Sequence, residues 1–131
     1  MTTNDERHLM IARHVMRHPQ SMRADTIVLW ERLAGELCAI IGQSGFETLY
    51  ARSVHVVRIQ YPWLALGSDP RFERLRASLD GQTLELAGQA SIALLTTFTD
   101  TLIQLIGASL TTAILQSAWG QDTADTAAEE S

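Results

Sequence analysis

The chain contains no lysine, and its ten basic residues are all arginines, the last of which is Arg76. Residues 1–76 carry eight acidic residues against these ten arginines, whereas residues 77–131 carry seven acidic residues and no base. Domains that bind nucleic acids need clustered positive charge to contact the phosphates. We therefore expect no nucleic-acid partner for this chain, whose net charge is −5.

Cysteine occurs only once, as Cys38, so the chain cannot form a disulfide within itself. Cys38 lies in an apolar helical pattern, where we expect a buried and inert thiol. A reducing compartment suits this composition. The first ten residues, MTTNDERHLM, are polar and mixed in charge, unlike a secretory signal. We therefore expect a cytoplasmic protein.

Motifs that carry catalysis are also lacking. The sequence shows no phosphate-binding loop, no nucleophile elbow, no zinc-ligand spacing and no pair of hydrolytic carboxylates. His14 and His18 share a helix face near His8, but no acidic or cysteine ligand stands at a supporting spacing. We expect no metal, no cofactor, no catalytic residue and no enzymatic activity.

Residues 101–121 contain no charge, and this length could span a bilayer. The run nevertheless contains three glutamines, three threonines and two serines, and no basic residue flanks it. We expect a buried helix here and no membrane association.

Apolar residues at steps of three and four predict helices along most of the chain. Predicted helices cover residues 6–18, a run from Ser21 or Asp25 to Ile41, residues 46–61, residues 70–80 and residues 83–119. Pro19 and Pro62 end two of these runs, and Gly42 and Gly45 interrupt the pattern between two others. The stretch SVHVVRIQY is rich in β-branched residues, but the unbroken spacing from Phe46 favours a helix.

The fold class that follows is all-α, a bundle of four to five helices around a long C-terminal helix at about 83–119. The sequence leaves open whether this helix is straight or broken at Gly107. Residues 20–120 would form the bundle domain, and residues 1–19 an N-terminal helix or arm. Residues 121–131 are acidic, small and unpatterned, which predicts a disordered tail.

Two segments resemble each other, LCAIIGQSGFETLYARSV at 37–54 and LIQLIGASLTTAILQSAW at 102–119. Each carries a leucine, an Ile-Gly pair, a nearby serine and a further helical run. The similarity indicates either two copies of a helix–glycine–helix unit or a chance likeness of apolar helices. Two copies would pack about a pseudo-twofold axis.

The helix at 83–119 has two apolar faces, and the other predicted helices could cover only one of them. A second copy of the chain could cover the other face. We therefore expect a non-enzymatic interaction or regulatory module, a homodimer of a kind found in bacterial signalling. The predicted dimer or partner interface consists of Leu95, Ile103, Ile106, Leu110 and Ile114. A charge at Ile103 should break this dimer.

The alternative hypothesis is a small-ligand sensor or carrier, in which the surplus apolar surface lines a pocket between helices. Its polar contacts would be Tyr50, His55 and Asp100. Asp100 is the only charge between Glu85 and Asp122, so it should be paired, protonated or exposed. An ion pair with Arg52 or Arg58 from the other half of the chain is the pairing we expect.

Overall fold

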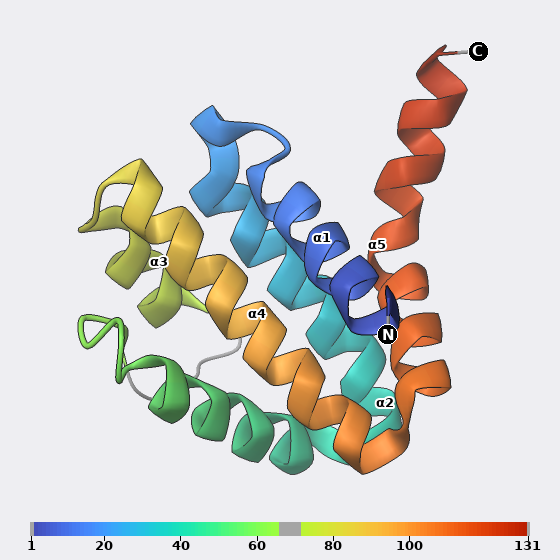
Figure 1. Ribbon diagram of the computed structural model, residues 1–131, viewed down its shortest axis with the longest axis horizontal. Helices are drawn as coiled ribbons and strands as arrows, with labels where there is room; N and C mark the ends of the chain where they lie inside the picture. The colour runs from blue at the N-terminus through green and yellow to red at the C-terminus, as the bar shows by residue number, and fades with distance from the viewer. Residues whose placement is uncertain (1, 66–71, 131) are drawn as a thin grey trace.

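A computed structural model describes residues 2–65 and 72–130, with side chains described for 7–65 and 72–119. All of its regular structure is helical: α1 (Thr2–Met16), the 3-10 turn η1 (Pro19–Ser21), α2 (Met22–Val57), α3 (Glu73–Asp80), α4 (Leu84–Ile106) and α5 (Ala108–Glu130) (Figure 1). These helices pack against one another around a shared apolar core. The all-α class predicted from the sequence is confirmed.

Most helix ends follow local signals in the sequence. Pro19 follows the end of α1 and opens the short η1 turn before α2 begins. Thr83 caps α4, because its hydroxyl accepts a hydrogen bond from the Leu86 N–H at 3.2 Å. The stretch SVHVVRIQY is helical up to Val57 and continues as a turn, so the preference for a helix over a strand was correct.

Two glycines break helices in the same way. Gly42 has φ 80° and ψ 163° inside α2, and Gly107 has φ 92° and ψ 160° between α4 and α5. Only glycine adopts this region readily, because a Cβ atom would clash with the backbone. The segment 83–119 is therefore broken rather than straight, because the chain turns at Gly107, the break that its sequence allowed. In α2, Gly42 separates a first limb, residues 22–41, from a second limb, residues 43–57.

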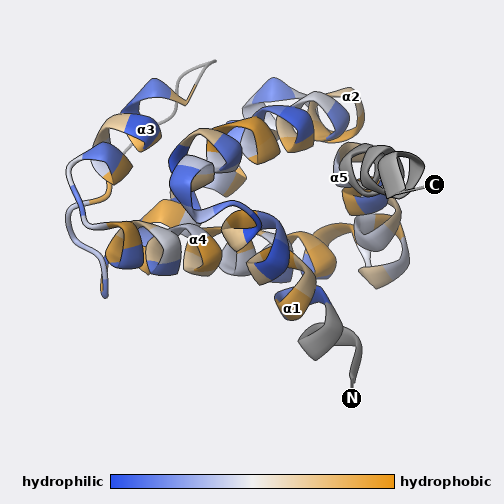
Figure 2. Cartoon of the chain, turned by 90° about the horizontal axis from the view of Figure 1, so that it is seen from above, coloured by the Kyte–Doolittle hydropathy of each residue, from blue (hydrophilic) through white to orange (hydrophobic). Residues whose placement is uncertain are grey.

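The turn at each glycine brings the following helical segment against the other half of the molecule. The second limb of α2 lies against α4, where the Phe46 and Phe98 rings are 5.5 Å apart. Helix α5 lies against the first limb, and the Trp119 indole N–H donates a hydrogen bond to the Leu29 carbonyl at 3.1 Å. Figures 1 and 2 show α4 near the middle of this arrangement, with α1 beside it.

Helix α1 packs against α4 and α2, and the division of the chain into residues 1–19, 20–120 and 121–131 stays a prediction. Ile11 and Val15 are fully buried, one turn apart on the same helix face. Gly88 of α4 lets α1 approach closely, because a Cβ atom there would lie 2.8 Å from the Met16 sulfur. The second apolar side of α4 is thus covered from within the chain.

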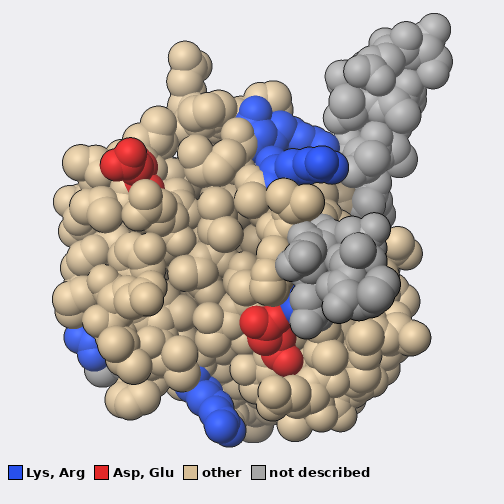
Figure 3. Space-filling view, viewed as in Figure 1, with Lys and Arg blue, Asp and Glu red and all other residues tan. Residues whose placement is uncertain are grey.

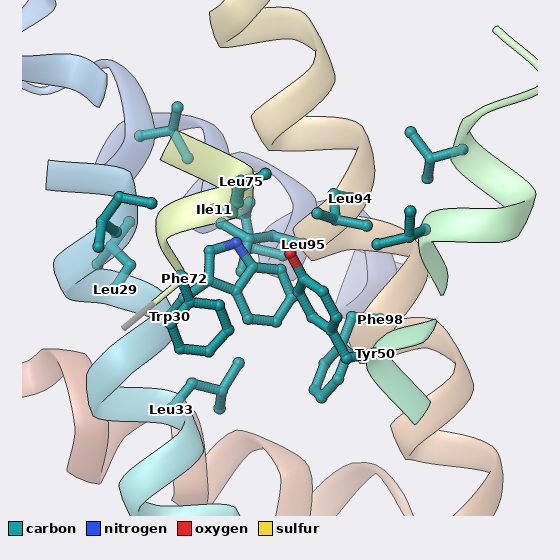
Figure 4. Close-up of a cluster of buried hydrophobic side chains, with 14 of the residues drawn as sticks. Ile11, Leu29, Trp30, Leu33, Tyr50, Phe72, Leu75, Leu94, Leu95 and Phe98 are labelled. Carbon is teal, nitrogen blue, oxygen red and sulfur yellow. The ribbon is translucent and has the colours of Figure 1, made fainter. Parts of the chain in front are cut away.

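Trp30 of the first limb stands at the centre of the core and is fully buried (Figure 4). Its ring centroid lies 5.0 to 6.5 Å from four other aromatic rings, those of Phe46, Tyr50, Phe72 and Phe98. Three of these contacts are edge-on, a geometry that aromatic rings favour. One side chain therefore joins both limbs of α2, the start of α3 and α4.

Replacing Trp119 by phenylalanine should lower the free energy of unfolding by about 1 to 2 kcal/mol. The change removes the hydrogen bond to Leu29 and leaves space at a fully buried position. Urea unfolding followed by far-ultraviolet circular dichroism measures the loss. Trp63→Phe is the matched control, because Trp63 is only partly buried. Equal losses in the two variants would contradict the proposed role of the Trp119 hydrogen bond.

Helix α5 continues to Glu130, and the side chains from residue 120 onward lie outside the described part. The expectation of a disordered tail at 121–131 therefore stays a prediction. Within the described part, no helix combines the length and the apolar character needed to cross a bilayer.

Candidate functional site

The outward side of α4 forms a ridge on the surface of the molecule. It consists of residues spaced three and four apart, which we call the α4 ridge: Leu86, Gln89, Ala93, Thr97, Asp100 and Gln104. Helix α4 carries only two charged residues, Glu85 and Asp100. Figure 3 shows the consequence, a broad uncharged surface over this helix with charged side chains scattered around it. Depletion of charge is typical of the centre of protein interfaces.

Two openings lie end to end between α4 and the second limb of α2. One, of about 410 Å³, is lined by Ser44, Gly45, Thr48, Leu49, Arg52, Thr101 and Leu105. The other, of about 290 Å³, is lined by Val56, Val57, Ile59, Gln60, Ala93 and Thr97. We call the two together the α2–α4 groove. Its rim includes large exposed aliphatic side chains, since Leu105 is 64% and Ile59 is 82% exposed.

Arg52 is the only charged residue that lines the α2–α4 groove. Its side chain is exposed and makes no hydrogen bond or ion pair with the part of the chain that the structure describes. The other arginine considered as a partner of Asp100 is occupied. The Arg58 guanidinium donates to the Leu64 carbonyl at 2.9 Å and to the Pro62 carbonyl at 3.1 Å.

On its other flank, the α4 ridge meets α1 through Asp100. The Arg7 guanidinium, which is 7% exposed, forms an ion pair with Asp100 Oδ1, and His8 Nε2 lies 3.2 Å from the same oxygen. An opening of about 310 Å³ lies here, lined by Arg7, Asp100, Ile103 and Gln104. The expectation that Asp100 is paired was correct, but its partner in the chain is Arg7 rather than Arg52 or Arg58.

The predicted interface residues are divided by the turn at Gly107. Leu95 is fully buried and Ile114 is 4% exposed, so the core of the chain itself occupies both. Ile103 and Ile106 are half-buried, and Leu110 is exposed. Three of the five residues can therefore meet a partner. Leu95 cannot, because α1 and α2 pack over its side of α4, and Ile114 cannot, because it lies on the side of α5 that packs against α2 and α4.

The three residues predicted to edge a ligand pocket do not meet. Tyr50 is buried in the aromatic core, where its ring lies 5.1 Å from that of Trp30. His55 is exposed on the second limb of α2, and Asp100 is exposed on the α4 ridge. Of the three openings described above, one is lined by Asp100 and none by Tyr50 or His55.

The histidines of α1 do not form a metal site within the described residues. His14 uses Nδ1 to donate a hydrogen bond to the Met10 carbonyl at 2.9 Å, and its ring lies 5.4 Å from that of Trp119. Its contacts therefore belong to the packing of α1 against α5.

Comparison of the chain with protein-family models, with curated proteins and with solved structures gives no match in any of the three. The surface described above is therefore the basis for any functional conclusion.

Proposed function

We propose that this protein is a non-enzymatic helical interaction module that works as a homodimer. The observation that carries the proposal is the α4 ridge, a nearly uncharged helix face on which Leu86, Gln89 and Gln104 are exposed. A homodimer is the simplest assembly that covers such a face, because a twofold axis presents the same patch to itself.

The apolar residues near the two glycine turns give this proposal further support. Ile40, Leu105 and Leu110 are 41 to 64% exposed, although each is a large aliphatic side chain. Single exposed aliphatic residues are common on protein surfaces, whereas several near one another mark a site of interaction. The bend inside α2 and the turn from α4 to α5 lie toward the same end of the molecule (Figure 1).

We also propose that the two helix–glycine–helix units are copies of one ancestral unit. The supporting observation is that Gly42 and Gly107, aligned by the sequence similarity, have the same backbone conformation. The helical segment that follows the glycine in one unit packs against the helix that precedes the glycine in the other unit, and this holds for both units. Such an exchange is what a pseudo-twofold arrangement requires.

The expected result for the full chain is a molar mass of twice 14.5 kDa by light scattering after gel filtration. Dilution should shift the species towards a single chain, and the melting temperature should rise with protein concentration. A molar mass of 14.5 kDa that does not change up to high concentration would contradict the homodimer. A melting temperature that is independent of concentration would do the same.

A further inference from the structure

The α2–α4 groove has apolar walls that remain open to water. Val56 is 47%, Leu105 is 64% and Ile59 is 82% exposed. A pocket for a small molecule buries most of the ligand's surface, which walls as exposed as these cannot do. An amphipathic helix, in contrast, binds by laying one apolar face into such a groove. The exposure of the walls therefore favours a helical occupant over a small ligand.

The two openings of the groove are spaced like side chains on one face of a helix. On α4, Thr101 and Leu105 line the first opening, and Ala93 and Thr97 line the second. Each residue of the first pair lies two helical turns beyond one of the second pair, a rise of about 12 Å. Residues i and i+7 of a bound helix lie on one face about 10 Å apart. Two apolar side chains of that helix can therefore enter the two openings together.

Arg52 lies between the two openings and carries the only charge among the residues that line them. Residues 44–52 of α2 contribute to the first opening, and residues 56–60 to the second. The Arg52 side chain is exposed and has no hydrogen bond or ion pair within the described residues. A guanidinium in this position selects a carboxylate, which it binds through charge-assisted hydrogen bonds. On the bound helix the carboxylate would lie at i+3 or i+4, midway between the two apolar residues.

The charge of the groove disfavours a second copy of the chain as its occupant. A twofold axis that pairs two grooves along their whole length passes near their midpoints. Arg52 lies near this midpoint, so the two guanidinium groups would face each other, and no acidic residue lines the groove between them. Like charges opposite each other at an interface weaken binding. The groove therefore fits an acidic helix of different sequence better than it fits itself.

We infer that the α2–α4 groove binds an amphipathic helix of another protein. This helix presents apolar residues at i and i+7, which enter the two openings, and a carboxylate at i+3 or i+4, which pairs with Arg52. The inference goes beyond the proposed homodimer, because it assigns a second kind of partner. The α4 ridge and the groove share Ala93 and Thr97, so the bound helix and a second copy that covers the ridge compete for α4.

A displayed library of helical peptides tests the inference on the full-length chain. Each peptide is about 14 residues long, with leucine fixed at i and i+7 and every other position randomised. Peptides selected on the wild-type chain should carry aspartate or glutamate at i+3 or i+4, because Arg52 is the charge that they meet there.

Two variants of the groove show where the selected peptides bind. Arg52→Glu should raise the peptide dissociation constant about 10-fold, and lysine in place of the peptide carboxylate should restore binding to this variant. Leu105→Gln should also raise the dissociation constant about 10-fold, because it removes part of the apolar wall. Both residues are exposed, so both variants should fold, which circular dichroism checks.

Each variant has a matched control outside the groove. Arg76→Glu in α3 makes the same change of charge at an exposed arginine. Leu9→Gln in α1 makes the same apolar-to-polar change at a leucine that is 56% exposed. Neither residue lines the groove, so neither control should change the peptide dissociation constant. Fluorescence anisotropy of labelled peptides measures all of these constants.

The inference would be overturned by a library that yields no binder, or by binders without the acidic residue. Binders that respond to the controls as strongly as to the groove variants would also overturn it. A homodimer whose dissociation constant rises in both groove variants would assign the groove to a second copy, which overturns the inference and leaves the homodimer intact. A monomeric wild-type chain that selects the expected peptides would contradict the homodimer and support the inference.

Discussion

Trp30→Ala is expected to lower the free energy of unfolding by about 4 kcal/mol, a large part of the roughly 5 to 15 kcal/mol that stabilises an ordinary domain. Trp30 is fully buried and touches four aromatic rings, which belong to the second limb of α2, to α4 and to the start of α3. Alanine leaves a large cavity, because surrounding helices held by other contacts cannot collapse into the space. Urea unfolding followed by far-ultraviolet circular dichroism measures the change.

Trp30→Phe is the control for this experiment. The indole N–H of Trp30 is buried without a hydrogen-bond partner, so phenylalanine removes an unsatisfied donor while keeping an aromatic ring. The expected loss is about half that of the alanine variant. If Trp30→Ala lowers the free energy of unfolding no more than Trp30→Phe does, the surrounding rings must close the space. The central position of Trp30 would then contribute little to stability.

The second large effect is expected at the glycine turns. Gly42→Ala and Gly107→Ala should each cost about 1 to 3 kcal/mol, and the double variant about the sum of the two. A Cβ atom at either position meets nothing within 4 Å, so the cost comes from the backbone conformation alone. Calorimetry or urea unfolding of the two single variants and the double variant measures it.

Gly35→Ala provides a control of opposite sign. Gly35 lies in the first limb of α2, is exposed, and a Cβ atom there also meets nothing within 4 Å. Alanine should stabilise the helix by about 1 kcal/mol at this position. Stabilisation at all three glycines would contradict the positive φ values of Gly42 and Gly107 and would favour straight helices through both turns.

The local sequence predicts most helix boundaries here, but it leaves the break at Gly107 undecided. Pro19, Pro62 and Thr83 give signals that act within a few residues, and the structure follows them. A glycine inside a helix costs only about 1 kcal/mol relative to alanine, so local terms barely distinguish a straight helix from a broken one. The packing of α5 against the first limb of α2 favours the broken form over a straight helix.

The candidate site was harder to predict, because its geometry depends on segments far apart in the sequence. An unpaired charge in an apolar helix predicts that Asp100 needs a partner, but the sequence offers ten arginines. The partner proves to be Arg7, which is 93 positions away. The burial of Leu95 could not be foreseen for the same reason, since it depends on how the chain turns at Gly107 and on the docking of α1.

Contacts between residues early and late in the chain have a consequence for protein synthesis. Arg7 meets Asp100 across 93 positions and Leu29 meets Trp119 across 90, so neither contact can form until most of the chain has been made. At 5 to 20 residues per second, the ribosome needs about 5 to 20 seconds to reach Asp100 after Arg7. During that interval the apolar faces of α1 and α2 lie open. The core is therefore completed only after translation has passed Trp119.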